Sequence, residues 1–335
     1  MASYRDSGVD IDAGNESVKL MKDSVRSTFN KNVLTDLGAF GGAYSIASLS
    51  KMKHPILVST MDGVGTKLKV AAMMNKWSSV GEDIVNHCSN DVLCLGAKPL
   101  FFLDYVAASK LEPQNLASVV SGMAKACREV DCVLIGGETA EMPGVYEKGE
   151  HDIAGCMVGV VEKSGMVDGS KIKKGDVMVA LASDGLHTNG YSLARKVLFD
   201  EAGFSPNDFV KGLNNTVGAE LLKVHRSYSV AVLALAQKIR VKGIAHITGG
   251  GLVENVPRVI PKGLKPVFDY SSIVVPPVFR LIQEKGSIGE KEMFRVFNMG
   301  VGLVLVVPRA DALKSLEFLS LRGERAWVLG KIASG

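Results

Sequence analysis

The sequence lacks the features that mark several large classes of protein. Its five cysteines include no C-x-x-C pair, which argues against a zinc ribbon, and their odd number argues against a disulfide framework. No stretch approaches the roughly 18 uncharged apolar residues of a membrane span, and residues 1–12 contain no apolar signal-peptide core. We therefore expect a cytoplasmic protein with no membrane partner and with buried, reduced cysteines.

A strong charge imbalance and an aromatic surface are missing as well. The 39 basic and 35 acidic residues leave a net charge of +4, which is too small and too dispersed for a nucleic-acid surface. Trp77 and Trp327 are isolated, so no platform for stacking bases is visible. The sequence therefore predicts no nucleic-acid partner.

The common nucleotide-binding and nucleophile motifs are absent too. There is no G-x-x-x-x-G-K-[ST] loop and no G-x-G-x-x-G run after a strand, which excludes a P-loop and leaves a dinucleotide fold unsupported. No G-x-S-x-G elbow occurs, and the sequence suggests no nucleophilic cysteine–histidine pair. If the chain binds a nucleotide, it does so in another way.

Glycine is the residue in excess, with 36 in 335 residues, against an average use of about 7%. Four glycine-containing segments follow apolar strands, at residues 62–67, 136–141, 183–190 and 248–251. Glycine lets backbone N–H groups approach an anion closely, and a following helix adds positive charge. One such segment is usually just a turn, but four in one chain favour a phosphate-rich ligand.

The arrangement of segments predicts two domains that mix strands and helices. The length suggests about two domains, and a stretch rich in Gly, Lys, Ser and Asp at 163–176 marks the boundary, giving domains 1–165 and 166–335. Apolar spacing predicts a helix that Asn15 caps and that runs to about Phe29, and a longer helix over about 217–240. The fold class is therefore α/β or α+β.

Three carboxylates and one lysine suggest phosphoryl chemistry. Asp62 follows a strand, Asp91 lies in a predicted helix, and Glu138 lies in a glycine turn, so their oxygens can converge on Mg²⁺. Lys67 can neutralise a transferring phosphoryl group. Taken alone, Asp62 is equally well a helix cap and Asp91 an exposed helix residue, whereas a structural turn gains little from Glu138.

Among the six histidines, His187 alone lies in a glycine segment. It can bind a substrate phosphate or act as an acid or base, or it can simply be a loop residue bonded to the backbone. His246 is expected to be a packed core residue, and the sequence assigns no role to His225.

Seven motifs occur in a fixed order along the chain: YRDSGVDIDAGN at 4–15, DGVGTK at 62–67, ND at 90–91, GAKPLFFLDY at 96–105, GGETAEMP at 136–143, HTNGYSL at 187–193 and TGGG at 248–251. With these motifs the chain resembles the phosphoribosylformylglycinamidine cyclo-ligase (aminoimidazole ribonucleotide synthetase) family over essentially its whole length. Asp184 stands where we expect a serine in that family.

The resemblance implies a homodimer whose N-terminal sheets join into a β-barrel, with a C-terminal α/β layer. It implies ATP-dependent ring closure of formylglycinamidine ribonucleotide to aminoimidazole ribonucleotide, ADP and phosphate in purine synthesis. The formyl oxygen would be phosphorylated, and a substrate nitrogen would then displace phosphate.

The resemblance also implies roles for individual residues. Asp62, Asp91 and Glu138 would hold Mg²⁺, and Asp62, Lys67, Asp91 and His187 would be catalytic. The ATP contacts would be Lys22, Phe40, Gly41, Gly42, Asp62, Thr66, Lys67, Asp91, Gly137, Glu138 and Thr139. The ribonucleotide contacts would be His187, Thr188, Asn189, Gly190, Gly249, Gly250 and Gly251.

Two alternatives stay open at this point. A related kinase such as thiamine-monophosphate kinase is similar, but it lacks the GGETAEMP run. A non-catalytic nucleotide-binding regulator could keep the fold, but it would be expected to lose a metal carboxylate or Lys67, and all are present here.

Overall fold

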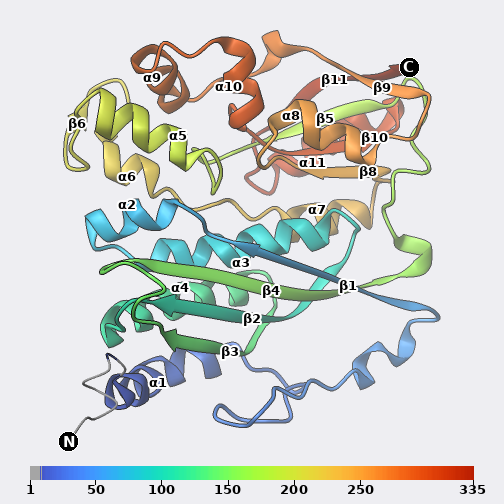
Figure 1. Cartoon of the computed structure of the whole chain (residues 1–335). Coiled ribbons are helices and arrows are strands. Elements are labelled where there is room, and N and C mark those ends of the chain that lie inside the picture. Colours follow the sequence, from blue (N-terminus) through green and yellow to red (C-terminus); the bar gives the residue numbers. More distant parts are fainter. Residues whose placement is uncertain (1–7, 9) are drawn as a thin grey trace, which may run out of the picture. The chain divides into compact units, whose positions relative to one another are not determined.

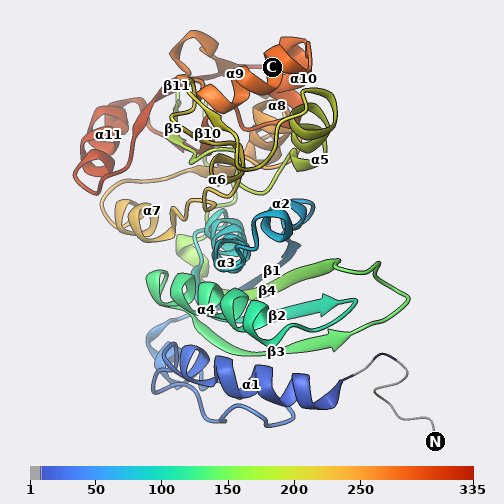
Figure 2. The same ribbon diagram turned by 90° about the vertical axis from the view of Figure 1, so that its left-hand side faces the viewer.

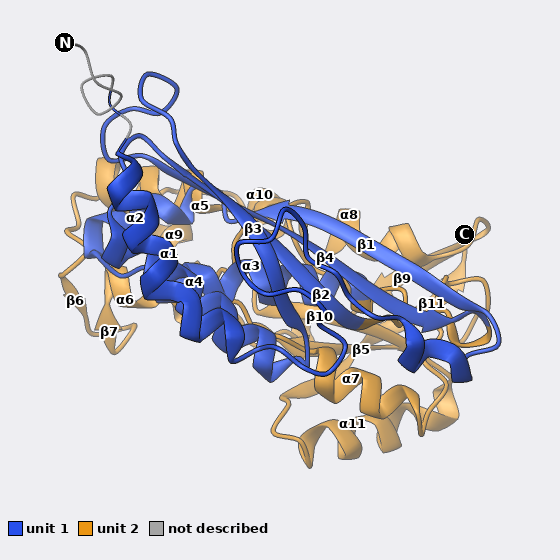
Figure 3. Ribbon diagram, turned by 90° about the horizontal axis from the view of Figure 1, so that it is seen from below, with its two compact units in different colours: residues 1–92, 99–163 blue, residues 93–98, 164–335 orange. Residues whose placement is uncertain are grey.

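A computed structural model of the chain describes residue 8 and residues 10–335. The chain divides into two compact units, one formed by residues up to 92 and 99–163, the other by residues 93–98 and 164–335 (Figure 3). Residues 4–7 and 9 of the first sequence motif lie outside the described residues. Within the described part, no helix has the length and apolar character needed to span a bilayer.

Unit 1 is a four-stranded mixed sheet with helices (Figure 1). Its strand order is β1-β4-β2-β3, in which β1 and β4 are antiparallel and β2 and β3 are parallel. The strands are β1 (Pro55–Gly63), β2 (Lys98–Ala108), β3 (Val133–Glu141) and β4 (His151–Glu162). The helices are α1 (Ile11–Arg26), α2 (Lys67–Met74), α3 (Ser78–Leu93) and α4 (Pro113–Glu129), with a 3-10 turn at Ala47–Lys51.

Helices α3 and α4 lie on one face of the sheet (Figure 2), and they approach each other closely at a glycine of each helix. A Cβ on Gly81 of α3 would lie 1.9 Å from the Val119 oxygen, and one on Gly122 of α4 would lie 2.0 Å from the Ser78 oxygen. The crossing therefore depends on glycine in both helices. On the other face of the sheet, Leu57 of β1 leaves 62% of its surface exposed.

Helix α1 begins and ends earlier than its sequence pattern predicts. Its N-cap is Asp10, whose Oδ1 accepts the backbone N–H groups two and three residues further on, at 3.1 and 3.2 Å. The prediction of Asn15 as the cap is wrong, because Asn15 lies inside the helix. The helix ends at Arg26 and not at Phe29.

Unit 2 contains a five-stranded antiparallel sheet of order β8-β10-β5-β11-β9. Its strands are β5 (Val177–Ala182), β8 (Gly243–His246), β9 (Leu264–Phe268), β10 (Val301–Val307) and β11 (Ala326–Ser334), beside a small hairpin of β6 (Phe209–Val210) and β7 (Asn215–Thr216). Its helices are α5 (Tyr191–Arg195), α6 (Val217–Leu221), α7 (Ser229–Ala236), α8 (Gly251–Asn255), α9 (Pro277–Lys285), α10 (Glu290–Val296) and α11 (Ala312–Ser320).

The predicted long helix over 217–240 is wrong, because the chain forms two short helices, α6 and α7, joined by a non-helical segment. That segment carries Tyr228 into the core, where its hydroxyl donates to the Ala182 oxygen at 2.8 Å. It also carries Arg226, which bonds Asp184 and Glu324 at 3.0 and 2.9 Å. These long-range contacts outweigh the helical preference of the local sequence.

Candidate active site

Two of the predicted metal carboxylates in unit 1 meet at one histidine. Asp62, near the end of β1, lies 2.8 Å from His87 Nε2, and Asp91 Oδ2 lies 3.8 Å from the same nitrogen. Thr60 donates its hydroxyl to Asp91 at 3.0 Å. His87 and Asp91 are four residues apart on α3 and so share one face of the helix, which brings both side chains to β1.

The charges of this cluster support one another. Burial alone would lower the pKa of His87, but the Asp62 hydrogen bond and the Asp91 charge outweigh it and raise the pKa. Burial likewise opposes ionisation of Asp62, yet the bond from His87 holds the pKa of that carboxyl below its usual value. The site thus pairs a cation-stabilising cluster of two carboxylates with an imidazole that the sequence analysis did not single out.

This donor set fits Mg²⁺. The side chains of Asp62 and Asp91 keep 41% and 26% of their surface exposed, so their oxygens are reachable from solvent. Mg²⁺ prefers hard oxygen ligands and is commonly held by one or two carboxylates together with phosphate oxygens. Asp62 and Asp91 of unit 1 supply two such carboxylates, and both are open to a phosphate-bound ion.

Lys67, at the start of α2, points inward. Its side chain is fully buried and its ammonium lies 2.7 Å from Asp83 Oδ2, which is also fully buried. Burial lowers the pKa of Lys67, and the Asp83 charge opposes this shift. Thr66, the residue just before α2, is exposed. A direct role of Lys67 in neutralising phosphate stays a prediction and requires the ammonium to leave Asp83.

Glu138 lies in strand β3, so its assignment to a glycine turn is wrong. The strand continues through the glycines, and Glu138 is paired with Tyr105 of β2. β1 and β3 are the two edges of the sheet, and three strand spacings of about 4.8 Å separate their backbones by roughly 14 Å. Glu138 as a ligand of the same ion as Asp62 therefore stays a prediction.

The remaining predicted ATP contacts gather near β3 and α1. Gly42 approaches β3 so closely that a Cβ there would lie 2.7 Å from the Ile135 side chain. Phe40 is exposed in the same loop as Gly41, and Lys22 is exposed on α1, which packs against α4 and β3. The predicted ATP contacts thus form two groups in unit 1, one at β1 and α3 and one at β3, where Gly137 and Thr139 also lie.

Asp104 of β2 is an ionisable group that sequence reasoning missed. A Cβ on Gly137 would lie 2.2 Å from Asp104 Oδ1, so the carboxyl fits only because residue 137 is glycine. Burial, with a smaller contribution from the charge of Glu138, raises the pKa of Asp104 to about 7. The signal that could have identified Asp104 is its place in the GAKPLFFLDY motif at 96–105, which overlaps β2, the strand next to β3. Its residue type alone gave no such signal.

Asp104→Asn should stabilise the protein in a pH-dependent way. Asn imitates the protonated carboxyl, whereas the unfolded aspartate titrates near pH 4 and the folded one near 7. Because the folded state binds the proton more tightly, wild-type stability falls as pH rises between these values. The melting temperature of the variant should exceed that of the wild type by more at pH 8 than at pH 5. A constant difference would contradict the raised pKa.

His187 of unit 2 is held by a strained backbone and by a second histidine. Its φ of +60° is uncommon for a residue other than glycine, and its Nε2 lies 3.2 Å from the Asp184 backbone nitrogen. Its ring stacks on His225 at 4.0 Å between centroids, and His225 Nε2 lies 3.0 Å from His246 Nε2. His225, to which the sequence assigned no role, therefore links His187 to the buried His246 and also contacts Thr188 Oγ1 at 3.3 Å.

The two predicted substrate segments of unit 2 are joined to each other. Asn189 accepts the Gly249 N–H at 3.0 Å, which connects the loop after β5 to the loop after β8. Gly190, Gly250 and Gly251 all have positive φ values, of 78°, 95° and 59°, that favour glycine. The structure thus brings the predicted ribonucleotide contacts from both segments together.

The chain is similar to known proteins along nearly its whole length. Residues 46–161 match the N-terminal domain, and residues 173–335 the C-terminal domain, of the AIR synthase related protein family. A phosphoribosylformylglycinamidine cyclo-ligase of Geobacter metallireducens is 50% identical over 99% of this chain and 95% of its own length. Those of Geotalea daltonii and Alkaliphilus metalliredigens are 51% and 46% identical over 99% of this chain, and 95% and 96% of their own lengths.

The chain belongs to the phosphoribosylformylglycinamidine cyclo-ligase family. Its fold is more widely shared. A thiamine-monophosphate kinase from Stenotrophomonas maltophilia superposes with a TM-score of 0.72, at 14% identity over 94% of each chain. The hydrogenase maturation protein HypE of E. coli superposes with a TM-score of 0.66, at 17% identity over 95% of this chain and 92% of that one. At such identities the likeness concerns the fold alone.

Within this cyclo-ligase family member, the charge of Asp184 is balanced by nearby cations. Arg226 and Arg325 lie 3.0 and 3.4 Å from its two carboxylate oxygens. The extra negative charge beside the loop after β5 is therefore offset by cations of the same unit, which limits its repulsion of an anionic ligand.

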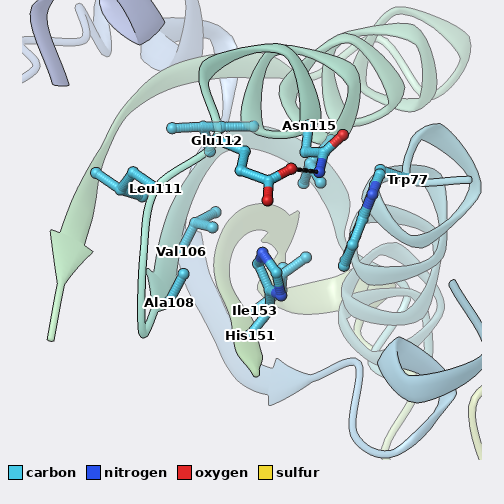
Figure 4. A pocket seen from close by; sticks show the side chains of 10 residues that line it. Trp77, Val106, Ala108, Leu111, Glu112, Asn115, His151 and Ile153 are labelled. Carbon is cyan, nitrogen blue, oxygen red and sulfur yellow. Dashed lines mark hydrogen bonds between the residues drawn. The ribbon is translucent and has the colours of Figure 1, made fainter. Parts of the chain in front are cut away.

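Unit 1 also contains a small pocket that none of the predicted site residues lines (Figure 4). The Trp77 and His151 rings face each other there with centroids 4.4 Å apart, and Asn115 donates to Glu112 at 2.6 Å. None of the residues predicted to bind ATP lines it. The pocket is mainly apolar and is not part of the candidate site of unit 1.

Proposed function

We propose that this chain catalyses the ATP-dependent closure of formylglycinamidine ribonucleotide to aminoimidazole ribonucleotide, ADP and phosphate. The observation that carries the proposal is the meeting of Asp62 and Asp91 at His87 in a chain about half identical to cyclo-ligases along its whole length. A solved HypE of the same fold is described as a complex with ATP, with a TM-score of 0.64 at 18% identity. That relationship supports ATP as the phosphoryl donor.

The reaction has two steps, and neither needs a protein nucleophile. The γ-phosphoryl group moves from ATP to the formyl oxygen of the substrate, which makes an O-phosphorylated imidate and leaves ADP. A substrate nitrogen then attacks the imidate carbon, the carbon–oxygen bond to phosphate breaks, and the nitrogen loses a proton. Such chemistry depends mainly on positioning and charge neutralisation.

The residues of unit 1 supply the charge neutralisation. Asp62 and Asp91 would hold Mg²⁺, which when bound offsets the negative charge of the polyphosphate. His87 favours the ionised form of Asp62 and lies within ion-pair distance of both carboxylates. Lys67 is proposed to neutralise the transferring phosphoryl group once its ammonium leaves Asp83, and Glu138 is proposed as a nucleotide contact.

The two joined loops of unit 2 suit the ribonucleotide. Backbone N–H groups of glycine loops bind phosphate oxygens without adding net charge. His187, with Thr188 and Asn189, would contact the substrate, and its stacking on His225 restricts the ring to one orientation. We propose these residues as the ribonucleotide contacts.

The direct test incubates the protein with ATP, Mg²⁺ and formylglycinamidine ribonucleotide and measures the aminoimidazole product colorimetrically. We expect one ADP for each aminoimidazole formed. ADP without that product would favour a kinase such as thiamine-monophosphate kinase, and the absence of ATP binding would favour a non-catalytic regulator.

We also propose that unit 1 forms a homodimer through the sheet face on which Leu57 lies. Leu57 and Met61 lie on the same face of β1 and leave 62% and 70% of their surfaces exposed. Large apolar side chains that are exposed in a single chain are typical of a surface that a partner covers. Pairing two such faces into a β-barrel would bury these side chains.

Leu57→Lys should shift the protein from dimer to monomer, because a lysine at this face would carry its charge into the interface. Light scattering coupled to gel filtration measures the mass directly. Leu321→Lys, at a residue 80% exposed in unit 2, is the matched control and should leave the mass unchanged. A dimeric Leu57→Lys protein would argue against this interface.

A further inference from the structure

Two buried asparagines of unit 2 each hold one of the proposed substrate loops. Asn255 of α8 is 3% exposed, and its Nδ2 lies 3.3, 3.1 and 2.9 Å from the carbonyl oxygens of Thr248, Gly249 and Gly251. Its Oδ1 accepts the Thr248 hydroxyl at 3.4 Å. An amide group has two N–H donors, so these three carbonyls share them. One side chain thus gathers the whole turn.

Asn298 does the same for the loop after β5. It is also 3% exposed, and its Oδ1 accepts the Ser183 hydroxyl at 2.9 Å and the Gly300 N–H at 2.8 Å. Its Nδ2 donates to the Gly185 oxygen at 3.0 Å. Ser183 also donates its hydroxyl to Gly185 at 3.1 Å, and its N–H to Gly300 at 3.0 Å. One buried amide therefore bonds Ser183, Gly185 and Gly300 together, and two further bonds among these residues close the first turn of the loop.

The direction of these bonds decides what the loop after β8 presents. In a trans peptide the C=O and N–H point in opposite directions. Tying the Thr248 and Gly249 carbonyls to Asn255 therefore turns the next N–H groups, those of Gly249 and Gly250, away from it. The Gly249 N–H meets Asn189 Oδ1 at 3.0 Å. The Gly251 N–H donates to the Thr248 oxygen at 3.0 Å within the turn, so the Gly250 N–H is the donor of this turn that is turned away from Asn255 for a ligand.

Asn189 has unused donor capacity at the same place. Its Oδ1 is occupied by Gly249, whereas its Nδ2 is buried and has no hydrogen-bond partner among the described residues. A buried amide donor without a partner costs free energy, and a ligand acceptor would remove that cost. This orphaned group marks the junction of the two loops as a place where an oxygen of a ligand is expected.

Glycine loops need such external support. Gly185, Gly190, Gly250 and Gly251 all have positive φ and no side chain to pack, and glycine loses more conformational freedom on ordering than any other residue. If a loop becomes ordered only when the ligand binds, the lost conformational entropy weakens binding. A loop that is ordered beforehand avoids this loss of affinity. Buried side-chain amides are a means of ordering it beforehand.

We infer that Asn255 and Asn298 are positioning residues for the ribonucleotide, which hold the two glycine loops so that their amides and Asn189 Nδ2 can donate to its anionic oxygens. The inference rests on the proposed function for the identity of the substrate. Neither asparagine needs to touch the substrate, because each acts through the loop that it holds.

The test compares Asn255→Ala with Asn207→Ala, a change of the same type at an exposed residue of unit 2. Asn255→Ala should raise KM for formylglycinamidine ribonucleotide about tenfold or more, while KM for ATP and kcat change less than about threefold. Asn207→Ala should leave all three unchanged. Equal increases in both KM values, or no increase in either, would overturn the inference, because a general loss of structure would not select one substrate.

Two additions keep the test decisive. If Asn255→Ala does not fold, Asn298→Ala makes the same prediction through the other loop. Calorimetric binding of ribose 5-phosphate needs no turnover, so it separates the two proposals. Wild-type binding that Asn255→Ala loses, without aminoimidazole formation by the wild type, would support the positioning role and refute the proposed reaction. Equal binding by both proteins would refute the positioning role.

Discussion

Asp91→Asn should reduce kcat for aminoimidazole formation by at least about a hundredfold, as the removal of one electrostatic group from a reaction centre commonly does. Asparagine preserves the size of the side chain and can still accept the Thr60 hydroxyl, which lies 3.0 Å from Asp91 Oδ2. Only the charge near His87 is lost, 3.8 Å from its Nε2. The Mg²⁺ concentration for half-maximal activity should therefore rise together with the fall in kcat.

The matched control is Asp200→Asn, which makes the same change at an exposed residue of unit 2. It should leave both the turnover and the Mg²⁺ titration unchanged. If Asp91→Asn also titrated like the wild type, Asp91 would have no part in holding the metal. Asp62→Asn should behave as Asp91→Asn does, because both carboxylates contact the same nitrogen of His87.

Gly122→Ala and Gly81→Ala should each lower the melting temperature by roughly 6–12 °C. The added Cβ would lie 2.0 or 1.9 Å from a backbone carbonyl oxygen of the opposite helix. A backbone atom cannot rotate away as a side chain can, so α3 and α4 must separate. Overpacking of this kind costs about 3 kcal/mol, and each kcal/mol lowers the melting temperature of a domain this size by roughly 2–4 °C.

Gly14→Ala provides the control within a helix of the same unit. A Cβ at Gly14 meets nothing within 4 Å, and the residue lies inside α1. Alanine is favoured over glycine in a helix, so this variant should be slightly more stable than the wild type. Scanning calorimetry of the three variants measures the difference. Equal melting temperatures for Gly14→Ala and Gly122→Ala would contradict the close crossing.

Local sequence was a good guide where an element's own pattern is strong. Pro113 marks the first residue of α4, and the apolar runs before residues 62 and 183 are strands β1 and β5. Where two local signals compete, the prediction from local sequence was wrong. Asp10 and Asn15 are both good capping residues, and Asp10 caps α1. Glu138 follows two glycines, yet pairing with β2 keeps it in a strand.

The candidate site shows the same division. The chemistry proposed for Asp62, Asp91 and His187 rests on residue types and spacing, since carboxylates can hold cations and glycine segments can bind anions. Their partners are residues without a motif of their own, such as His87, His225 and Asn255. Each of them contacts a predicted site residue or its loop because folding packs two separate segments of the chain together.

Residue types and local order therefore account for the family and the mixed α/β class, and they predict the kinds of ligand. Which carboxylates meet, and which lysine is buried against which aspartate, depends on long-range packing. Asp62 and His87 are joined because β1 and α3 pack together, and Lys67 is bonded to Asp83 because α2 turns it inward. Local patterns report only the chain within a turn or two, whereas burial and charge pairing are properties of neighbours that folding brings from elsewhere.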